Sequence, residues 1–471
     1  MTNLSAATAS SESAFNKSYI WVISLVAALG GLLFGYDWVV IGGAKPFYEK
    51  YFHLVDPAQQ GWAMSCALVG CLLGAVLSGA LTDRFGRKPL LVLSACLFAV
   101  SSAGTGFASS FYVFFSWRIA GGLAIGLASS LSPMYIAEVS PAKLRGRLVS
   151  INQLTVVIGI LLAQVVNWLI ARPVPASATA DQILNSWNGQ VGWRWMFGVT
   201  VVPSLLFFVG MLFVPESPRW LAKKGAHAKA RLTLAKIGGT AYADQALLEI
   251  EATLMQATDK AEFRKLLEPR VRKALLVGIV LAVFQQWCGI NVIFNYAEEV
   301  FAAAGFTVSD ILFNIVVTGA VNLIFTFVAM GLVDKAGRRA LMLFGSAGLT
   351  VVYTLLGAAY HAHRHGIYTL MLVVGAIACY AMSLAPVAWV VISEIFPNQV
   401  RGTAVAIAVS ALWIASFILT YTFPLLNHAL GASGTFWIYA GICAIGFVFI
   451  KFQLPETRGK TLEEIESFWS T

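Results

Sequence analysis

The chain has 471 residues, of which 58% are hydrophobic and only 12% are charged, and its formal net charge is +9. Soluble domains hold about 45–50% apolar residues, so this composition argues against a soluble enzyme. The sequence also offers no phosphate-cradling loop, nucleophile elbow or cluster of metal-ligating residues. We therefore expect neither catalysis nor a bound cofactor or metal.

About twelve apolar stretches are long enough to cross a membrane, which takes roughly 17 or more residues in a helix. Drawn at full length, they contain two charged residues, Asp37 and Arg118. We therefore expect an all-α polytopic membrane protein. The expected spans are residues 19–44, 61–81, 90–108, 111–136, 148–170, 196–214, 274–297, 311–333, 340–360, 367–393, 402–427 and 434–450.

Positive charge is distributed unequally between the two sides of these spans. Of the 32 Lys and Arg residues, Arg118 is intramembrane, 26 fall on one side, and only five fall on the other, namely Lys45, Lys50, Arg172, Arg194 and Arg364. Because basic loops stay inside, we expect both ends of the chain to be cytoplasmic and the protein to lie in the plasma membrane, the inner membrane in a bacterium. A nucleic-acid partner is not expected, since it would need these charges on one face with interleaved aromatic rings.

Three further features concern the membrane helices themselves. All six cysteines fall within apolar spans, which predicts packing roles rather than disulfides. The beginning of the chain lacks a basic region followed by a nearby cleavage site, so we expect the first span to be retained. The patterns Gly70-x-x-x-Gly74 and Gly122-x-x-x-Gly126 predict helices that approach closely.

The chain repeats itself on the two sides of a long polar stretch. Residues 83–88 (DRFGRK) match residues 334–339 (DKAGRR), and residues 215–219 (PESPR) match the beginning of 455–460 (PETRGK). Such a parallel duplication is associated with alternating-access transport. The expected parts are a cytoplasmic tail at 1–18, six-helix bundles at 19–214 and 274–454, a cytoplasmic helical linker at 215–273 and a second cytoplasmic tail at 455–471.

The repeated motifs fall at the expected cytoplasmic ends of the helices. Acidic and basic groups from neighbouring helices could pair there and latch the outward-open state when the inner side is closed. The alternative is that these charges only fix orientation, but Asp and Glu contribute little to orientation and still recur at matched positions. The candidate gate residues are Asp83, Arg84, Arg87, Glu138, Arg145, Glu216, Arg219, Asp334, Arg338, Glu394 and Arg401.

The two intramembrane charges predict a partnership. Asp37 lies seven residues before the outer end of the first span, and Arg118 lies seven residues after the outer start of the fourth. At 1.5 Å per residue both are roughly 10 Å below the outer edge, and equal depth permits a salt bridge. Arg118 favours the ionised carboxylate whereas burial favours the neutral acid, so a changing environment would make a proton switch. A purely structural ion pair is the alternative.

Amide side chains lie where a membrane helix seldom carries them. Gln285 and Gln286 fall near the middle of the seventh span, and amides there need hydrogen-bond partners. Pro386 is expected to break the tenth helix near the same depth. Amides and indole rings without charge fit a sugar or polyol better than an ion, although interhelical contacts or interfacial anchoring remain alternatives. The other candidate polar and indole groups are Asn291, Asn322, Trp389 and Trp413.

These paired motifs, in this order and number, resemble the sugar porter family of the major facilitator superfamily, and within it the bacterial xylose/proton symporters. The segments 215–219 and 285–291 (QQWCGIN) are the more specific part of the resemblance. It implies twelve transmembrane helices in two six-helix bundles, with Asp37 and Arg118 as the proton-coupling pair. The sugar ligands that it implies are Phe34, Gln153, Gln285, Gln286, Asn291, Asn322, Trp389 and Trp413.

Two positions depart from the family pattern. Leu412 precedes Trp413 where relatives often have Asn or Gln, and Asn295 stands with Tyr296 where many have two tyrosines. One hydroxyl contact to the sugar is therefore expected to be lost, and the outer gate is expected to differ.

The expected function is proton-coupled symport of a neutral monosaccharide, a pentose or hexose such as xylose or glucose, by a monomer in the lipid bilayer. A facilitative uniporter or a polyol (inositol) transporter on the same fold is the alternative. A sugar sensor is disfavoured because only about twenty residues follow the last span, and a drug exporter because its cavity would be more apolar. His361, His363 and His365 alternate in one loop, but with no Cys or acidic residue nearby they are not expected to bind a metal.

Overall fold

The computed structural model describes residues 15–175, 177–256, 266, 268–364, 366–396 and 400–458, and these are almost entirely helical. Within them, eleven helical segments are long and apolar enough to cross a membrane. The last of these, α19 (Arg401–Gln453), has 53 residues and contains a non-helical residue, Gly431, with φ 68° and ψ 175°. It therefore joins two membrane-crossing helices, which accounts for the twelve expected spans.

The first half of the chain supplies six membrane segments, and the sixth of them, Asn188–Phe213, is divided into three pieces. A short helix, α6 (Ala180–Leu184), precedes it. The elements are α1 (Lys17–Tyr51), α2 (Pro57–Phe85), α3 (Lys88–Gly106), α4 (Phe111–Val139), α5 (Ala142–Ile170), the π-helical η1 (Asn188–Gly192), α7 (Trp193–Gly198) and α8 (Val201–Phe213).

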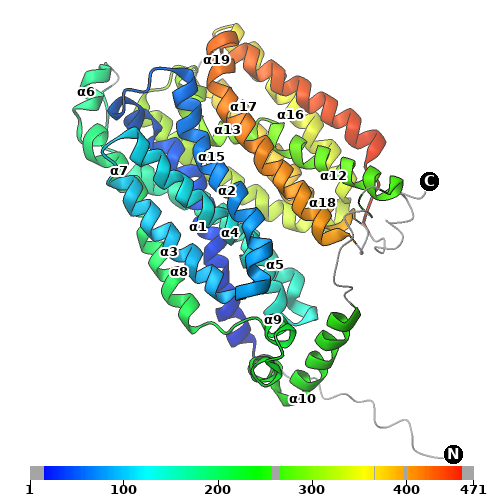
Figure 1. Ribbon diagram of the computed structural model, residues 1–471. Coiled ribbons are helices and arrows are strands. Elements are labelled where there is room, and N and C mark those ends of the chain that lie inside the picture. The colour runs from blue at the N-terminus through cyan, green and yellow to red at the C-terminus, as the bar shows by residue number, and fades with distance from the viewer. Residues whose placement is uncertain are drawn as a thin grey trace, which may run out of the picture.

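The second half follows two helices of the polar stretch, α9 (Pro218–Lys223) and α10 (His227–Gln256). Its elements are α12 (Pro269–Trp287), α13 (Ile290–Asn295), α14 (Ala297–Ala302), α15 (Val308–Ala336), α16 (Arg338–His361), α17 (Ile367–Met382), α18 (Leu384–Glu394) and α19. Figure 1 shows the two halves side by side, with α6 at one end of the molecule and α9 and α10 at the other. We call these the α6 end and the α10 end.

Two membrane helices are broken near mid-depth. The seventh span divides at Gly289, whose φ of 86° lies in the left-handed region that favours glycine. The tenth span divides at Ser383, so that Pro386 falls in the first turn of α18, where its missing N–H leaves no hydrogen bond unmade. The break near Pro386 was expected from the sequence, whereas the break at Gly289 was not.

Close packing of α2 against α4 depends on glycine. A Cβ atom at Gly122 would collide with the backbone oxygen of Ala67, and one at Gly70 would collide with the backbone oxygen of Ile119. Gly74 and Gly126 meet the opposite backbone in the same way. The close approach expected from the two Gly-x-x-x-Gly patterns is confirmed, and the six cysteines, as expected, are free.

The halves meet along two helix pairs, α2 with α19 and α5 with α15. Aromatic rings contact across both, with ring centroids 6.3 Å apart for Trp62 and Phe417 and 5.9 Å apart for Trp168 and Phe313. Helix α1 of the first half also contacts α13 and α14 of the second. The seam between the halves is therefore formed by α1, α2 and α5 of the first half and by α13, α14, α15 and α19 of the second.

Replacing Gly122 by alanine is expected to destabilise the protein by about 1–3 kcal/mol, because the added methyl group must push α2 away from α4. Gly79→Ala on α2 is the matched control, since a Cβ atom there meets open space. Thermal unfolding of the purified variants in detergent measures the difference. Equal melting temperatures for the two variants would contradict the close contact.

Candidate transport site

Asp37 of α1 and Arg118 of α4 form an ion pair inside the first half. The Nη1 of Arg118 donates to Oδ1 of Asp37 at 2.9 Å, and its Nη2 donates to the Asp37 backbone oxygen at 3.3 Å. Both residues are only 3% exposed. The structure therefore brings together the two charges whose equal depth predicted a contact, while the transfer of a proton by this pair stays a prediction.

The pair is not saturated with hydrogen bonds. Oδ2 of Asp37 and Nε of Arg118 are buried and find no partner within the described part of the chain. The guanidinium group lies over the ring of Phe197, 5.4 Å from its centroid, which is a favourable cation–π position. The spare carboxylate oxygen leaves a position on which a proton can be held without breaking any other hydrogen bond.

The amides of the seventh span form one continuous chain of hydrogen bonds. Gln285 donates to the hydroxyl of Tyr380 at 2.6 Å, Gln286 donates to Oε1 of Gln285 at 2.6 Å, and Asn291 donates to Oε1 of Gln286. The break at Gly289 places Asn291, on α13, within reach of the last turn of α12. All three amides are buried, and the chain of hydrogen bonds supplies the partners that buried amides need.

Three aromatic rings meet where the two halves face each other. Phe34 and Trp38 come from α1 and Trp413 from α19, with centroid distances of 6.0 Å, 5.9 Å and 6.1 Å among them. Trp413 is 2% exposed, and its indole Nε1 has no hydrogen-bond partner among the residues described. Rings beside an unused N–H suit a sugar, which offers both C–H faces and hydroxyl oxygens.

The other sequence-predicted sugar ligands are less tightly connected. Asn322 is buried on α15, Gln153 is half-buried on α5, and Trp389 is 36% exposed on α18. No hydrogen bond or ring contact between described residues joins their side chains to the amide chain or to the three rings. The structure thus joins Gln285, Gln286 and Asn291 in the amide chain and Phe34 and Trp413 in the group of rings. The binding of a sugar by any of the eight stays a prediction.

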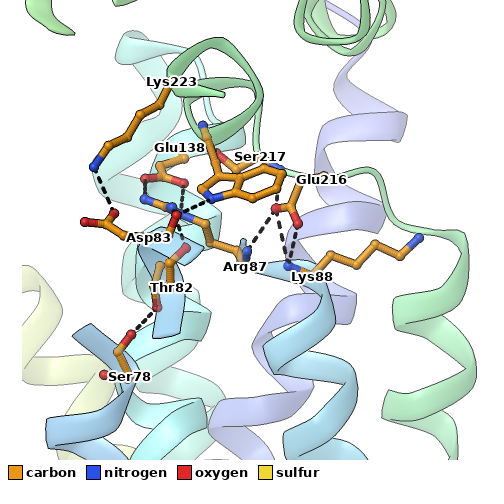
Figure 2. A network of polar contacts seen from close by, with 10 residues as sticks. Ser78, Thr82, Asp83, Arg87, Lys88, Glu138, Glu216, Ser217 and Lys223 are labelled. Atoms are coloured by element: carbon orange, nitrogen blue, oxygen red, sulfur yellow. Dashed lines mark hydrogen bonds and ion pairs between the residues drawn. The ribbon is translucent and has the colours of Figure 1, made fainter. Parts of the chain in front are cut away.

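At the α10 end, a network of polar contacts ties the start of α3 to its neighbours (Figure 2). Arg87 makes two bonds of 2.7 Å with Glu138 of α4. Glu216 accepts from the backbone N–H groups of Arg87 and Lys88 at 3.0 and 3.2 Å, which caps the helix. Burial raises the pKa of Glu216, while its hydrogen bonds to backbone N–H groups oppose that rise.

The second half repeats this arrangement. Nη2 of Arg338 lies 3.5 Å from Glu394, and Glu456 accepts from the backbone N–H groups of Arg338 and Arg339 at 2.9 and 3.1 Å. The two Arg–Glu pairs, Arg87 with Glu138 and Arg338 with Glu394, each lie within one half. They fasten helices of the same bundle in this structure and do not themselves latch one bundle to the other.

The remaining gate candidates are more peripheral. Asp83 is exposed and pairs with Lys223 at 3.1 Å, and Arg84 lies over Phe85. Arg145 and Arg401 donate to the backbone oxygens of Ala137 and Phe396, and Arg219 is exposed. The side chain of Asp334 lies outside the described residues.

At the α6 end, one buried lysine connects the two halves. Lys45 of α1 lies 2.9 Å from Glu49 of the same helix, and 2.5 and 3.6 Å from Glu299 and Glu298 of α14. The Lys45 side chain is 3% exposed, whereas the carboxylate side chains are 12–23% exposed. Burial raises the pKa of Glu299, and Lys45 opposes that rise. We call these four residues the Lys45 clamp, and it holds the halves together at this end.

Sequence reasoning missed the Lys45 clamp, Trp38 and Tyr380. Lys45 had been counted as one charge of an outer loop, although Glu49 one turn later and the neighbouring Glu298 and Glu299 after the seventh span were available as signals. A tyrosine within an apolar span requires a partner for its hydroxyl, which could have drawn attention to Tyr380. Nothing in the sequence alone marked Trp38 as a contact of Trp413.

Comparison with known proteins shows which family has this architecture. A family model described as sugar (and other) transporter matches residues 23–469. The D-xylose-proton symporter of Escherichia coli strain K12 is 40% identical over 486 residues, covering 97% of this chain and 96% of the symporter. The arabinose-proton symporter of Bacillus subtilis strain 168 is 39% identical over 455 residues, covering 96% of each chain.

A solved structure agrees with these relatives. The E. coli xylose transporter in a partially occluded inward-open conformation matches with a TM-score of 0.82 at 38% identity, covering 94% of this chain and all of that one. Fold and site together define a membrane transporter of the major facilitator superfamily, with twelve transmembrane helices in two six-helix bundles. The chain belongs to the sugar porter family of that superfamily.

Neutralising the clamp lysine by Lys45→Gln is expected to weaken closure at the α6 end, because three carboxylates then face one another without a cation. Removing one partner of a buried ion pair costs about 3–5 kcal/mol, and the partial exposure of these carboxylates makes that an upper bound. Lys50→Gln is the matched control, since Lys50 bonds the Pro46 backbone oxygen instead.

The measurement is the distance between spin labels at Val55→Cys and Ala362→Cys, exposed positions of the two halves at the α6 end. Pulsed electron resonance should report a larger long-distance population for Lys45→Gln than for Lys50→Gln, in a chain whose six native cysteines are replaced. The same distance distribution in both variants would show that the clamp does not hold this end closed.

Proposed function

We propose that the chain is a proton-coupled symporter of a neutral monosaccharide, a pentose or hexose such as xylose. The observation that carries the proposal is the buried Asp37–Arg118 ion pair with its unsatisfied carboxylate oxygen. An ionisable pair inside a membrane protein is expensive and usually marks a proton or ion pathway. Relatives named as proton symporters of xylose and of arabinose support the same conclusion.

The sugar would bind at the seam between the bundles. Amides on α12 and α13 match the donor and acceptor pattern of vicinal hydroxyls, and the rings of α1 and α19 would pack against the C–H face of the sugar. The absence of a charged side chain from the proposed ligand set favours a neutral ligand. The proposed ligands are Phe34, Gln153, Gln285, Gln286, Asn291, Asn322, Trp389 and Trp413.

Proton binding would convert Asp37 to the neutral acid and weaken its hold on Arg118. A membrane potential of about 100 mV supplies roughly 2.3 kcal/mol per proton. At about 1.4 kcal/mol per tenfold ratio, one coupled proton can sustain roughly 50-fold accumulation of a neutral sugar. A uniporter would equilibrate the sugar and accumulate none.

The proposed topology makes the α10 end cytoplasmic and the α6 end external, with both chain termini inside and the monomer embedded in the plasma membrane, the inner membrane of a bacterium. The bundles would span residues 19–214 and 274–454, with 215–273 as the cytoplasmic linker that contains α9 and α10, and with tails at 1–18 and 455–471. Closure by the Lys45 clamp and likeness to an inward-open relative support an inward-facing state. Reorientation of the two bundles would separate Lys45 from Glu298 and Glu299. It would join the bundles at the α10 end through the candidate gate residues.

Replacing Asp37 by asparagine is expected to abolish sugar-driven proton uptake, because the amide cannot bind the transported proton. External pH would be recorded in a lightly buffered, de-energised cell suspension as xylose, glucose, galactose, arabinose and inositol are added in turn. The unmodified protein should alkalinise the medium with its substrate, and Asp37→Asn should not. Rapid sugar equilibration without any pH change in the unmodified protein would identify a uniporter instead.

Truncating Gln286 to alanine is expected to reduce sugar uptake at least about 5-fold, since a buried hydrogen bond to a ligand is worth about 1–3 kcal/mol when one side is left unpaired. Gln245→Ala, an exposed glutamine of α10, serves as the control for expression and handling. Radiolabelled sugar uptake and the amount of monodisperse protein would be compared. Normal uptake by Gln286→Ala would remove the amide chain from the sugar site.

A further inference from the structure

Trp38 on α1 adjoins both the proposed proton site and the proposed sugar site. It follows Asp37 directly in the sequence, and its ring lies 5.9 Å from the ring of Trp413 and 6.0 Å from that of Phe34. Trp413 belongs to the other half of the molecule. The ring of Trp38 therefore bridges the seam between the bundles at the depth of the proton pair.

The same side chain lines a small cavity that also contains Arg118 and Asn295. The cavity walls come from both halves, since Asn295 ends α13 in the second half and the other lining residues belong to α1, α2 and α4. The amide oxygen of Asn295 is buried and finds no partner in the described ranges. A small space therefore lies beside the guanidinium group, with Trp38 as part of its wall, Asn295 as its other polar residue, and an otherwise apolar lining.

The strength of the Asp37–Arg118 pair depends on this space. Two opposite charges attract far more strongly in a dry interior than beside water, and water beside the guanidinium group would also hydrate its free Nε. A displacement of the Trp38 ring changes the width of the cavity, and hence the water that Arg118 meets. A sugar that packs against Phe34 and Trp413 would act on the Asp37–Arg118 ion pair through the Trp38 ring.

We propose that Trp38 is the positioning residue that couples sugar binding to proton binding, through its ring contact with Trp413 on one side and the Arg118 cavity on the other. This inference rests on the proposed symport and names the side chain that transmits it. Sugar packed against the Phe34 and Trp413 rings holds Trp38 in the position that loosens Arg118 from Asp37. Protonation of Asp37 in turn favours that same position.

Coupling of this kind has a measurable thermodynamic form. If a proton raises the affinity for sugar by some factor, sugar raises the affinity for the proton by the same factor. Typical couplings between two sites are about 5–150-fold. The Kd for sugar should therefore increase as the pH rises, and the size of that increase measures the coupling directly.

The experiment is calorimetric titration of the purified full chain with D-xylose between pH 5 and pH 9. We expect the Kd of the unmodified protein to increase at least about 5-fold across this range. In Trp38→Ala the Kd should change less than about 2-fold across this range, whatever its value at pH 5. Trp38→Phe keeps a smaller ring and should show an intermediate change.

Trp62→Ala is the matched control, because Trp62 also contacts a ring of the other half, that of Phe417, but does not line the Arg118 cavity. It should keep the full pH dependence. If Trp38→Ala fails to fold, Trp38→Leu and Trp38→Phe carry the test with the same expectation of a reduced change.

Equal pH dependence in the unmodified protein and in the Trp38 variants would overturn the role of Trp38 and leave symport intact. Loss of the pH dependence in Trp62→Ala as well would also overturn it, since any ring at the seam would then have the same effect. A Kd that is independent of pH in the unmodified protein, together with no alkalinisation by xylose, glucose, galactose, arabinose or inositol, would instead refute the proposed symport itself.

Discussion

A charged or polar group inside a membrane must find its partner within the protein, and this constraint organises the whole chain. Three sets of buried polar groups satisfy it in different ways. The Asp37–Arg118 pair is closed within the first bundle, and the amide chain that starts at Gln285 ends on Tyr380 within the second. Only the Lys45 clamp draws its members from both bundles. Groups whose partners lie in the same bundle can therefore stay together during transport. Groups whose partners lie in different bundles must separate.

The bundles themselves are secured by contacts that need not change. Helices of the same half are joined by Arg87 with Glu138 and by Arg338 with Glu394. The helices α3 and α16, which begin within the repeated segments 83–88 and 334–339, are capped by Glu216 and Glu456. Because these contacts are duplicated and internal, each half can move as a unit. The ion pairs that cross the seam at the α6 end involve carboxylate side chains that are 19–23% exposed. Separating these charges therefore costs less free energy than separating the almost fully buried charges of Asp37 and Arg118.

Hydropathy and the internal repeat predicted the membrane helices and the two-bundle architecture, because hydropathy and repeated motifs are properties of short stretches of sequence. What they could not predict are features set by partners distant in the sequence. The first span was expected to end at residue 44, where a lysine follows, yet α1 continues to Tyr51 because Lys45 finds Glu298 and Glu299 about 250 residues later. The break at Gly289 escaped notice because hydropathy does not register a residue in the left-handed region. The charged motif residues were expected to pair between neighbouring helices and latch the outward-open state. The pairs Arg87–Glu138 and Arg338–Glu394 do join neighbouring helices, both within one half, and their role as a latch stays a prediction.

The short segment after Gly289 carries residues that contact all three of these sites. Asn291 at its start belongs to the amide chain, Asn295 lines the Arg118 cavity, and Glu298 and Glu299 hold Lys45, all within nine residues. Hinges of this kind are a few element-terminal residues that absorb a change in φ and ψ, and a glycine at φ 86° with a helix on each side meets that description. Tyr296, with φ −116° and ψ 32°, separates α13 from α14, so Asn291 and Glu299 lie on two short helices joined at an irregular residue. In the proposed transport cycle, closure of the amide chain around a sugar and release of the Lys45 clamp would both displace this segment, which the break at Gly289 separates from the rest of the seventh span.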